Sequence, residues 1–258
     1  MTAVLVLAAV VCNAAIVGEP VEYTADGVTL KGFLAYDDEQ VGPRPGVLVV
    51  HEWWGHNDYA RKRAKMLAEL GYTALAVDMY GDGKQAGHPD DAGQFAAAVK
   101  NNMGVARARF EAAIRFLQEQ KTVDPDRIAA IGYCFGGGVV LEMAREGVDL
   151  KGVVSFHGSL GTDHPAEPGK VTARVLVCHG ADDQFVSEEQ IAVFKNEMET
   201  ADVRYKFRVY EGAKHSYTNP EADAFAERFE LPLGYSAEAD AASWKDMTNF
   251  LQKCFFTE

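Results

Sequence analysis

The sequence predicts one domain of the α/β class, with a mostly parallel central sheet, helices on both of its faces and an antiparallel hairpin at its start. Short apolar runs, which are typical of strands buried on both faces, alternate along the chain with longer segments of helical periodicity. The length of 258 residues suits a single α/β domain, and no repeat, linker or low-complexity tract divides it.

The hairpin is expected between residues 21 and 36, where Asp26-Gly27 joins two alternating runs, because glycine tolerates the positive φ of two-residue turns. Further strands are expected at 46–50, 72–77, 127–132, 152–156, 173–178 and 203–210. Helices are expected at 59–70, 92–120, 137–145, 187–200 and 237–255. The segment 219–235 has no clear period, and we expect it to shape a pocket entrance.

The charge excludes several partners. Lys and Arg total 25 against 38 Asp and Glu, and the net charge of −13 would repel phosphate backbones and anionic lipid heads. We therefore expect no nucleic-acid or membrane partner. The four cysteines are scattered without a C-x-x-C pair, so neither a disulfide framework nor a zinc site is indicated. No cofactor is expected, and no pattern specifies an oligomeric state.

The first fifteen residues resemble a signal peptide. Their apolar run, Ala3 to Cys12, is too short to span a bilayer but suits the hydrophobic part of such a peptide, and small residues offer cleavage after Ala14. No Lys or Arg precedes the run, so an N-terminal strand or a misassigned start in a cytoplasmic protein is the alternative. We expect an exported protein whose single domain spans residues 16–258.

The sharpest local pattern is Gly-Tyr-Cys-Phe-Gly-Gly-Gly at 132–138, between an expected strand and an expected helix. It matches the G-x-nucleophile-x-G turn, in which flanking glycines leave room for a strained, exposed nucleophile, here Cys134. The helix N-terminus also favours a thiolate. The alternative is a buried structural cysteine beside a glycine-rich turn. A phosphate-binding loop is disfavoured because the Gly-Lys-Ser/Thr ending is missing.

Two later motifs supply an acid and a base. The string His-Gly-Ala-Asp-Asp-Gln-Phe-Val at 179–186 follows one strand, and Gly-Ala-Lys-His-Ser-Tyr at 212–217 follows the last. Nucleophile, acid and then histidine is the order found in α/β-hydrolases, and open α/β sheets place their sites at the carboxyl ends of strands. We therefore predict a catalytic triad of Cys134, an aspartate of the first motif, and His215.

A fourth motif, His-Glu-Trp-Trp-Gly-His at 51–56, follows the first parallel strand. In this fold that loop and the residue after the nucleophile supply the backbone N–H groups of the oxyanion hole, here Trp53 and Phe135. The tryptophans also suit a pocket wall or the core. His51 and His56 are five positions apart rather than the four of the H-E-x-x-H metalloprotease helix, so no metal site is expected.

Together with Asp-Met-Tyr at 78–80, these motifs resemble the dienelactone hydrolase family from about Val17 to the C-terminus. The resemblance implies that Asp183, rather than Asp182, is the triad acid. It also implies that Glu52 contacts the resting Cys134 thiol and gives way to the histidine when substrate binds. A structural hydrogen-bonding role is the alternative for Glu52. The expected substrate is a small ester or lactone.

The sequence departs from the dienelactone-cleaving members where two arginines hold the substrate carboxylate. Asp82 and Asn219 stand at those positions, and an aspartate there repels an anion, although Lys84 could offset it. Dienelactone is therefore a doubtful substrate. The residues expected to line the pocket are Trp54, Tyr80, Asp82, Tyr217 and Asn219.

The predicted reaction begins when His215, oriented by Asp183, takes the proton of Cys134 as sulfur attacks the ester carbonyl and forms a thioester. One alternative is a non-catalytic ligand-binding homologue, which usually lacks a triad member, whereas none is missing here. Another is a redox-active thiol protein, which would favour a nearby resolving cysteine, and only Cys178 is a candidate.

Overall fold

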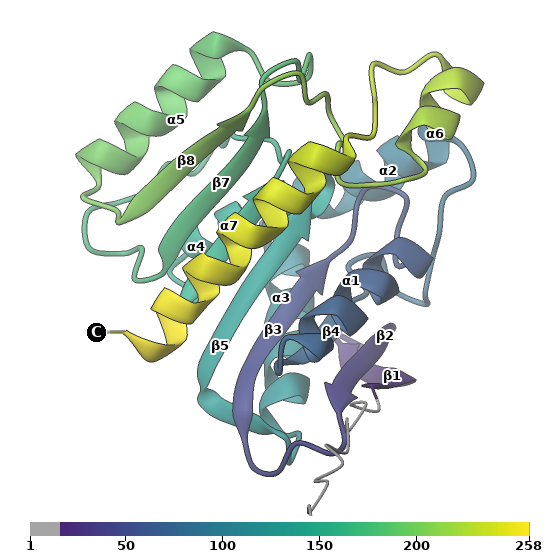
Figure 1. The fold of residues 1–258 in the computed structure, drawn as a ribbon, viewed down its shortest axis with the longest axis vertical. Helices are drawn as coiled ribbons and strands as arrows, with labels where there is room; N and C mark the ends of the chain where they lie inside the picture. The colour runs from purple at the N-terminus through teal and green to yellow at the C-terminus, as the bar shows by residue number, and fades with distance from the viewer. Residues whose placement is uncertain (1–15, 258) are drawn as a thin grey trace, which may run out of the picture.

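The computed structural model describes residues 16–257, which form one eight-stranded sheet in the order β1-β2-β4-β3-β5-β6-β7-β8 (Figure 1). The strands are β1 (Ile16–Ala25), β2 (Val28–Asp37), β3 (Arg44–Val50), β4 (Thr73–Val77), β5 (Val123–Tyr133), β6 (Gly152–Phe156), β7 (Arg174–Gly180) and β8 (Tyr205–Tyr210). The helices are α1 (Asp58–Glu69), α2 (Pro89–Lys100), α3 (Met103–Gln118), α4 (Phe135–Arg145), α5 (Glu188–Thr200), α6 (Ala222–Phe229) and α7 (Ala237–Phe256). The predicted fold class is confirmed.

The N-terminal hairpin forms as predicted. Strands β1 and β2 pair antiparallel, and Asp26 and Gly27 turn the chain with φ values of 48° and 77°. Strand β2 continues antiparallel onto β4, whereas every pair from β4 to β8 in the sheet is parallel. The carboxyl ends of β3, β5, β7 and β8 therefore lie at one edge of the sheet.

The sheet separates two hydrophobic cores. Along β3, Leu48 and Val50 belong to the core beneath α3, α4 and α5, whereas Val47 and Val49 belong to the core beneath α1 and α7. Figure 1 shows α7 crossing the front of the sheet, with α3 and α4 behind it. Both cores are needed because a strand's side chains alternate between faces, which explains why β3 is a continuous apolar run.

Two helical predictions were incomplete. The segment predicted as one helix over 92–120 is two helices, because Asn101 ends α2 and the Asn102 side chain accepts the Val105 N–H at the start of α3. Asparagine favours such caps over helix interiors. The segment 219–235, predicted to be aperiodic, contains α6. The predicted signal peptide lies outside the described residues.

Candidate active site

Four loops meet at the carboxyl edge of the sheet. They follow β3, β5, β7 and β8, and they carry Glu52, Cys134, Asp183 and His215 respectively. Glu52, Asp183 and His215 are 2%, 5% and 7% exposed, so their charged or polar groups are withdrawn from water and require partners.

Cys134 lies at the turn between β5 and α4 with φ 51° and ψ −114°, a left-handed conformation that disfavours residues with a Cβ atom. A Cβ atom on Gly132 would collide with the carbonyl oxygen of Gly136, and one on Gly136 would collide with that of Val50. The glycines of the motif are therefore required by close backbone approach. The strained turn leaves Cys134 at the N-terminus of α4, where unpaired N–H groups point outward.

His215 is held by Asp183. The distance between His215 Nδ1 and Asp183 Oδ2 is 2.8 Å, and Asp183 Oδ1 accepts the Phe185 N–H at 2.9 Å. Asp182, in contrast, is exposed. The structure therefore brings Asp183 to the histidine, which is the aspartate that the family resemblance implied.

The protonation of His215 is governed by the two groups on either side of its ring. Burial lowers its pKa, but the charge of Cys134 and the hydrogen bonds with Asp183 and Cys134 outweigh burial and raise the pKa to about 10. At neutral pH the arrangement therefore favours a protonated His215 between Asp183 and Cys134. A protonated histidine beside a cysteine favours the thiolate nucleophile and can supply a proton for a leaving group.

Glu52 is hydrogen-bonded to the loop that carries His215. Its Oε1 accepts from Ser216 Oγ at 2.9 Å and its Oε2 accepts from Asn219 Nδ2 at 2.6 Å. Burial raises the pKa of Glu52 above its ordinary value, and these two hydrogen bonds offset only part of that rise. Among the described residues its hydrogen bonds do not include the Cys134 thiol, so this state differs from the contact implied by the family resemblance.

A cavity of about 270 Å³ opens at this edge of the sheet. Cys134 and His215 line it, together with Trp53 and Phe135, the predicted oxyanion-hole residues. Leu233 also lines it, so the segment 219–235 contributes one wall, as expected from the sequence. The remaining lining residues are Ala96, Lys100, Gly138, Ser159, Phe185 and Val186.

The five residues predicted to line the pocket lie outside this cavity lining. Trp54 is buried because its ring stacks on Phe225 of α6, at a centroid distance of 4.5 Å. Tyr80 directs its hydroxyl at the Trp53 carbonyl oxygen, 3.0 Å away. Trp54 and Tyr80 thus contact Trp53, which lines the cavity, and do not line it themselves.

The two positions matched to carboxylate-binding arginines are also turned away. Asp82 is exposed and lies 4.0 Å from Lys84, measured between Oδ2 and Nζ. Asn219 is buried outside the cavity lining, where it donates to Glu52. Tyr217 is fully buried, and its hydroxyl donates to the Cys178 carbonyl oxygen at 3.4 Å. Sequence position alone did not predict these orientations.

The histidines of the first motif do not form a metal site. Met79 N–H donates to His51 Nε2 at 3.3 Å, and His51 Nδ1 contacts the Glu52 carbonyl oxygen. Burial lowers the pKa of His51 to about 4, so the ring is neutral at physiological pH. Within residues 16–257 no group of three or more His, Cys, Asp or Glu side chains is placed to hold a metal ion.

Sequence reasoning missed three residues near the site. Lys100, the last residue of α2, and Phe185 both line the cavity. His157, which follows β6, is fully buried against the Cys134 turn. Phe185 belongs to the 179–186 motif but was not assigned to the cavity. No sequence pattern marks Lys100 and His157, because they approach the site only through the folding of distant segments.

Among the helices of residues 16–257, none is long and apolar enough to cross a membrane.

Comparisons with known proteins agree with this architecture. The model of the dienelactone hydrolase family matches residues 30–255. An Aquifex aeolicus protein provisionally named a carboxymethylenebutenolidase is 26% identical over 243 residues, which cover 91% of this chain and 98% of that protein.

Two solved structures are also similar over 93% of this chain and 99% of theirs. A dienelactone hydrolase-like promiscuous phosphotriesterase from metagenomic libraries is 36% identical, with a TM-score of 0.85. A structure named m3DLH is 39% identical, with a TM-score of 0.87.

The parallel sheet, the strained turn after β5 and the cavity at the carboxyl edge define an α/β-hydrolase. The family match over residues 30–255 makes the assignment more specific: the chain belongs to the dienelactone hydrolase family. It is accordingly a carboxylic ester hydrolase.

Proposed function

We propose that the protein hydrolyses small esters or lactones through a Cys134–His215–Asp183 triad and a thioester intermediate. The observation that carries the proposal is the 2.8 Å contact between His215 and Asp183 beside a cysteine held at a strained strand-to-helix turn. Cys134 and His215 both line the 270 Å³ cavity, so a substrate carbonyl can reach both.

Acylation begins with attack of the Cys134 sulfur anion on the ester carbonyl carbon. The electron pair of the carbonyl moves to oxygen, and the N–H groups of Phe135 and Trp53 stabilise this oxyanion. The tetrahedral intermediate collapses as His215 gives its proton to the departing alkoxide. The products of this step are an alcohol, a thioester on Cys134 and a neutral His215.

Deacylation uses the neutral imidazole. His215 takes a proton from water while the oxygen attacks the thioester carbonyl, and collapse of the second tetrahedral intermediate releases the carboxylic acid and the thiolate. Asp183 holds His215 through Nδ1 in both steps, so Nε2 is the nitrogen that exchanges protons. Glu52 supports the same loop by accepting from Ser216 and Asn219.

The cavity favours small substrates with apolar acyl groups. Most of its lining side chains are apolar, and Lys100 and His215 are the ionisable cations among them. Asp82 and Asn219 offer no cation at the positions where dienelactone-cleaving relatives hold a carboxylate. We therefore propose neutral esters or lactones as the preferred substrate class.

Hydrolysis of a p-nitrophenyl ester series from acetyl to octanoyl, compared with cis-dienelactone, tests the proposal. We expect turnover of short acyl esters that is abolished by one equivalent of iodoacetamide, with slower cleavage of dienelactone. Full turnover after complete alkylation of Cys134 would overturn the cysteine mechanism. Alkylation without turnover of any ester or lactone would favour a binding or redox protein.

We further propose that the protein is exported, on the strength of the apolar run at residues 3–12. N-terminal sequencing of the protein from a fractionated bacterial host is expected to give a mature chain that begins after Ala14. An intact N-terminus in the cytoplasmic fraction would contradict export.

A further inference from the structure

His157 occupies the space between the two segments that carry the nucleophile and the base. It follows β6 with φ 39°, and its N–H donates to the Cys178 carbonyl oxygen at 2.8 Å, so its backbone is attached to β7. The side chain is fully buried and is absent from the cavity lining. It therefore does not touch a substrate bound beside Cys134.

One ring nitrogen of His157 contacts the backbone of the nucleophile. The Cys134 N–H donates to His157 Nδ1 at 3.1 Å and shares the same hydrogen with the Phe156 carbonyl oxygen at 3.0 Å. Because a backbone N–H can only donate, Nδ1 is the unprotonated nitrogen. The neutral ring consequently carries its proton on Nε2.

The other ring nitrogen contacts the loop that carries the base. His157 Nε2 lies 2.7 Å from Thr218 Oγ1, and Thr218 is three residues beyond His215. One imidazole therefore connects the backbone of Cys134 with the His215 loop. The rings of His157 and His215 also meet edge to face, with centroids 5.2 Å apart and planes at 64°.

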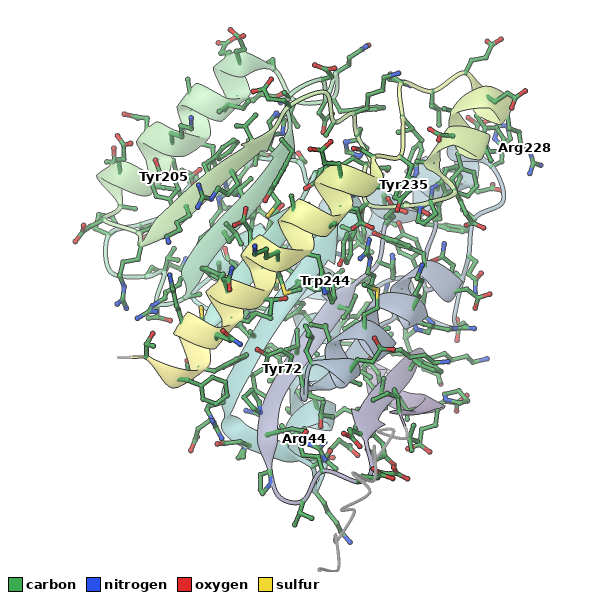
Figure 2. All side chains as sticks on the ribbon, viewed as in Figure 1. Arg44, Tyr72, Tyr205, Arg228, Tyr235 and Trp244 are labelled. Carbon is green, nitrogen blue, oxygen red and sulfur yellow. The ribbon has the colours of Figure 1, made fainter. Side chains whose placement is uncertain are left out.

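The connection continues to a buried ion pair. Thr218 Oγ1 lies 2.6 Å from Tyr59 Oη, and Tyr59 Oη accepts from Arg63 Nε at 3.2 Å. Arg63 Nη2 donates to both the Thr218 carbonyl oxygen and Asp240 Oδ1, each at 2.6 Å. Figure 2 labels Trp244 on α7, and the Arg63 guanidinium lies over that ring at 5.3 Å. Thr218 is thus fixed from α1 and α7.

Burial keeps the His157 ring neutral. Desolvation lowers the pKa of His157 well below its ordinary value, and the positive charges of His215 and Arg63 lower it further. A protonated ring would present an N–H to the Cys134 N–H and lose that hydrogen bond. The neutral Nε2–H tautomer is the form that satisfies both neighbours.

We propose that His157 and Thr218 act as positioning residues that set the separation between the Cys134 sulfur and the His215 imidazole. The proposal rests on the triad of the proposed function. In a near-attack arrangement, a displacement of about 1 Å can reduce the rate by about 100-fold. Loss of the His157–Thr218 hydrogen bond removes the link that His157 forms between the His215 loop and the Cys134 backbone.

The test compares Thr218→Val, Thr218→Ser and Thr248→Val in the full chain. Valine matches threonine in shape but removes the hydroxyl that accepts from His157 Nε2 and contacts Tyr59 Oη, whereas serine keeps that hydroxyl. Among the described residues the Thr248 hydroxyl bonds to the Trp244 carbonyl oxygen alone, so its replacement is a matched control for the loss of a hydroxyl. The readouts are kcat and KM for p-nitrophenyl acetate, the melting temperature, and the rate of Cys134 alkylation by iodoacetamide at pH 7.

We expect Thr218→Val to lower kcat by about 10- to 100-fold with KM within about threefold. Alkylation should also slow by about fivefold, because an imidazolium displaced from the sulfur no longer favours the thiolate. Thr218→Ser should restore kcat to within about threefold of the parent. Thr248→Val should match the parent in kcat and alkylation.

A second variant, His157→Asn, tests the other end of the connection. Asparagine tolerates positive φ, and its side-chain oxygen can replace Nδ1 but cannot reach Thr218. The double variant His157→Asn/Thr218→Val should be no slower than the slower single variant, because each substitution already removes the hydrogen bond between His157 Nε2 and Thr218 Oγ1.

Additive losses in the double variant, or equal kcat in Thr218→Val and Thr218→Ser, would overturn the proposal. A parent enzyme without esterase turnover would count against the proposed function instead. The alkylation rates would still decide the positioning role in that case, because they depend on the pairing of Cys134 and His215 and not on hydrolysis.

Discussion

The two ends of the sheet carry cavities that differ in volume and in the side chains that line them. At the amino ends of the parallel strands a cavity of about 740 Å³ is lined by five cationic side chains. They are Arg44, Arg127, Lys206, Arg208 and Lys253. At the carboxyl ends the cavity is only about 270 Å³, but Cys134 and His215 line it. Figure 2 labels Arg44 and Tyr72 near the lower end of the molecule and Tyr235 near the upper end, close to the start of α7.

The difference shows that a candidate active site is identified by reactive side chains that meet in one cavity, and not by the volume of that cavity. In the larger cavity Arg127 and Arg208 pair with acidic neighbours, at 2.6 Å and 3.8 Å, and Arg44 donates to backbone oxygens. In the smaller one His215 is buried and hydrogen-bonded to Asp183 on another loop. Parallel strands direct their carboxyl ends to this edge, and helix N-termini add positive potential there.

The largest expected effect on activity comes from replacing Cys134 in the smaller cavity, with Lys206 in the larger cavity as the comparison. Cys134→Ala should lower kcat/KM for p-nitrophenyl acetate by about 10⁴-fold or more, because only the oxyanion hole and substrate binding remain. Lys206→Ala, in the larger cavity, should leave kcat/KM within about twofold of the parent. Steady-state kinetics on folded proteins provide the measurement, and a large loss in Lys206→Ala alone would reverse the comparison.

A smaller loss of kcat is expected when the acid of the triad, Asp183, is replaced. Asp183→Asn should lower kcat by about 10³-fold, because the amide no longer selects the tautomer and orientation of His215. Asp182→Asn is the matched control, since Asp182 is exposed on the same loop, and it should change kcat by less than about twofold. Equal effects in the two variants would show that the 2.8 Å contact between His215 and Asp183 does not contribute to the reaction.

The sequence predicted the parts of this site that lie next to strand ends. Each of the four motifs follows an expected strand, so the parallel sheet brings them to one edge. That pattern predicted Cys134 and His215, whereas the family resemblance selected Asp183 over Asp182. Local periodicity also predicted the hairpin and the buried strands. A break such as Asn102 was missed because one capping residue scarcely changes the apolar pattern of 92–120.

The orientation of side chains could not be predicted in the same way. Asn219 lies within a loop that reverses direction, and its amide turns inward because the buried carboxylate of Glu52 requires donors. Lys100 and Leu233 reach the cavity from α2 and from the segment after α6. The contact between Asn219 and Glu52 joins residues 167 positions apart, so it depends on tertiary packing alone.

Buried histidines at the catalytic end are expected to limit acid stability. Burial, with repulsion from His51 and Arg61, lowers the pKa of His56 to about 3, whereas unfolded histidine titrates near 6.5. The unfolded state therefore binds more protons between these values. The stabilisation is present above pH 6.5 and is lost as pH falls toward 3, at about 1.4 kcal/mol per pH unit for each histidine.

Urea denaturation from pH 7 to pH 4 measures this effect. His56→Phe should reduce the acid slope of the free energy of unfolding by about 1.4 kcal/mol per pH unit, which is about 3 kcal/mol over the range. His164→Gln replaces an exposed histidine and should keep the parent slope. If His56→Phe also kept the parent slope, His56 would not be the group that takes up protons on unfolding.

The smallest expected effect is on KM, and it compares an exposed aromatic residue of the smaller cavity with one of the larger cavity. Phe185 is 47% exposed, and its ring lies 4.7 Å from that of His215, so it covers the base at the mouth of the smaller cavity. Phe185→Ala should raise KM for p-nitrophenyl butyrate by about fivefold, or about 1 kcal/mol, with kcat within about twofold. The backbone N–H that binds Asp183 remains in this variant.

Phe256→Ala is the control for Phe185→Ala, because Phe256 is 61% exposed and lines the larger cavity. Its KM should equal that of the parent. A lower kcat with unchanged KM in Phe185→Ala would mean that the ring orients His215 and does not bind the acyl group. A raised KM in both variants would indicate that apolar substrates bind at either end of the sheet. In that case only the presence of Cys134 would make the smaller cavity the place of reaction.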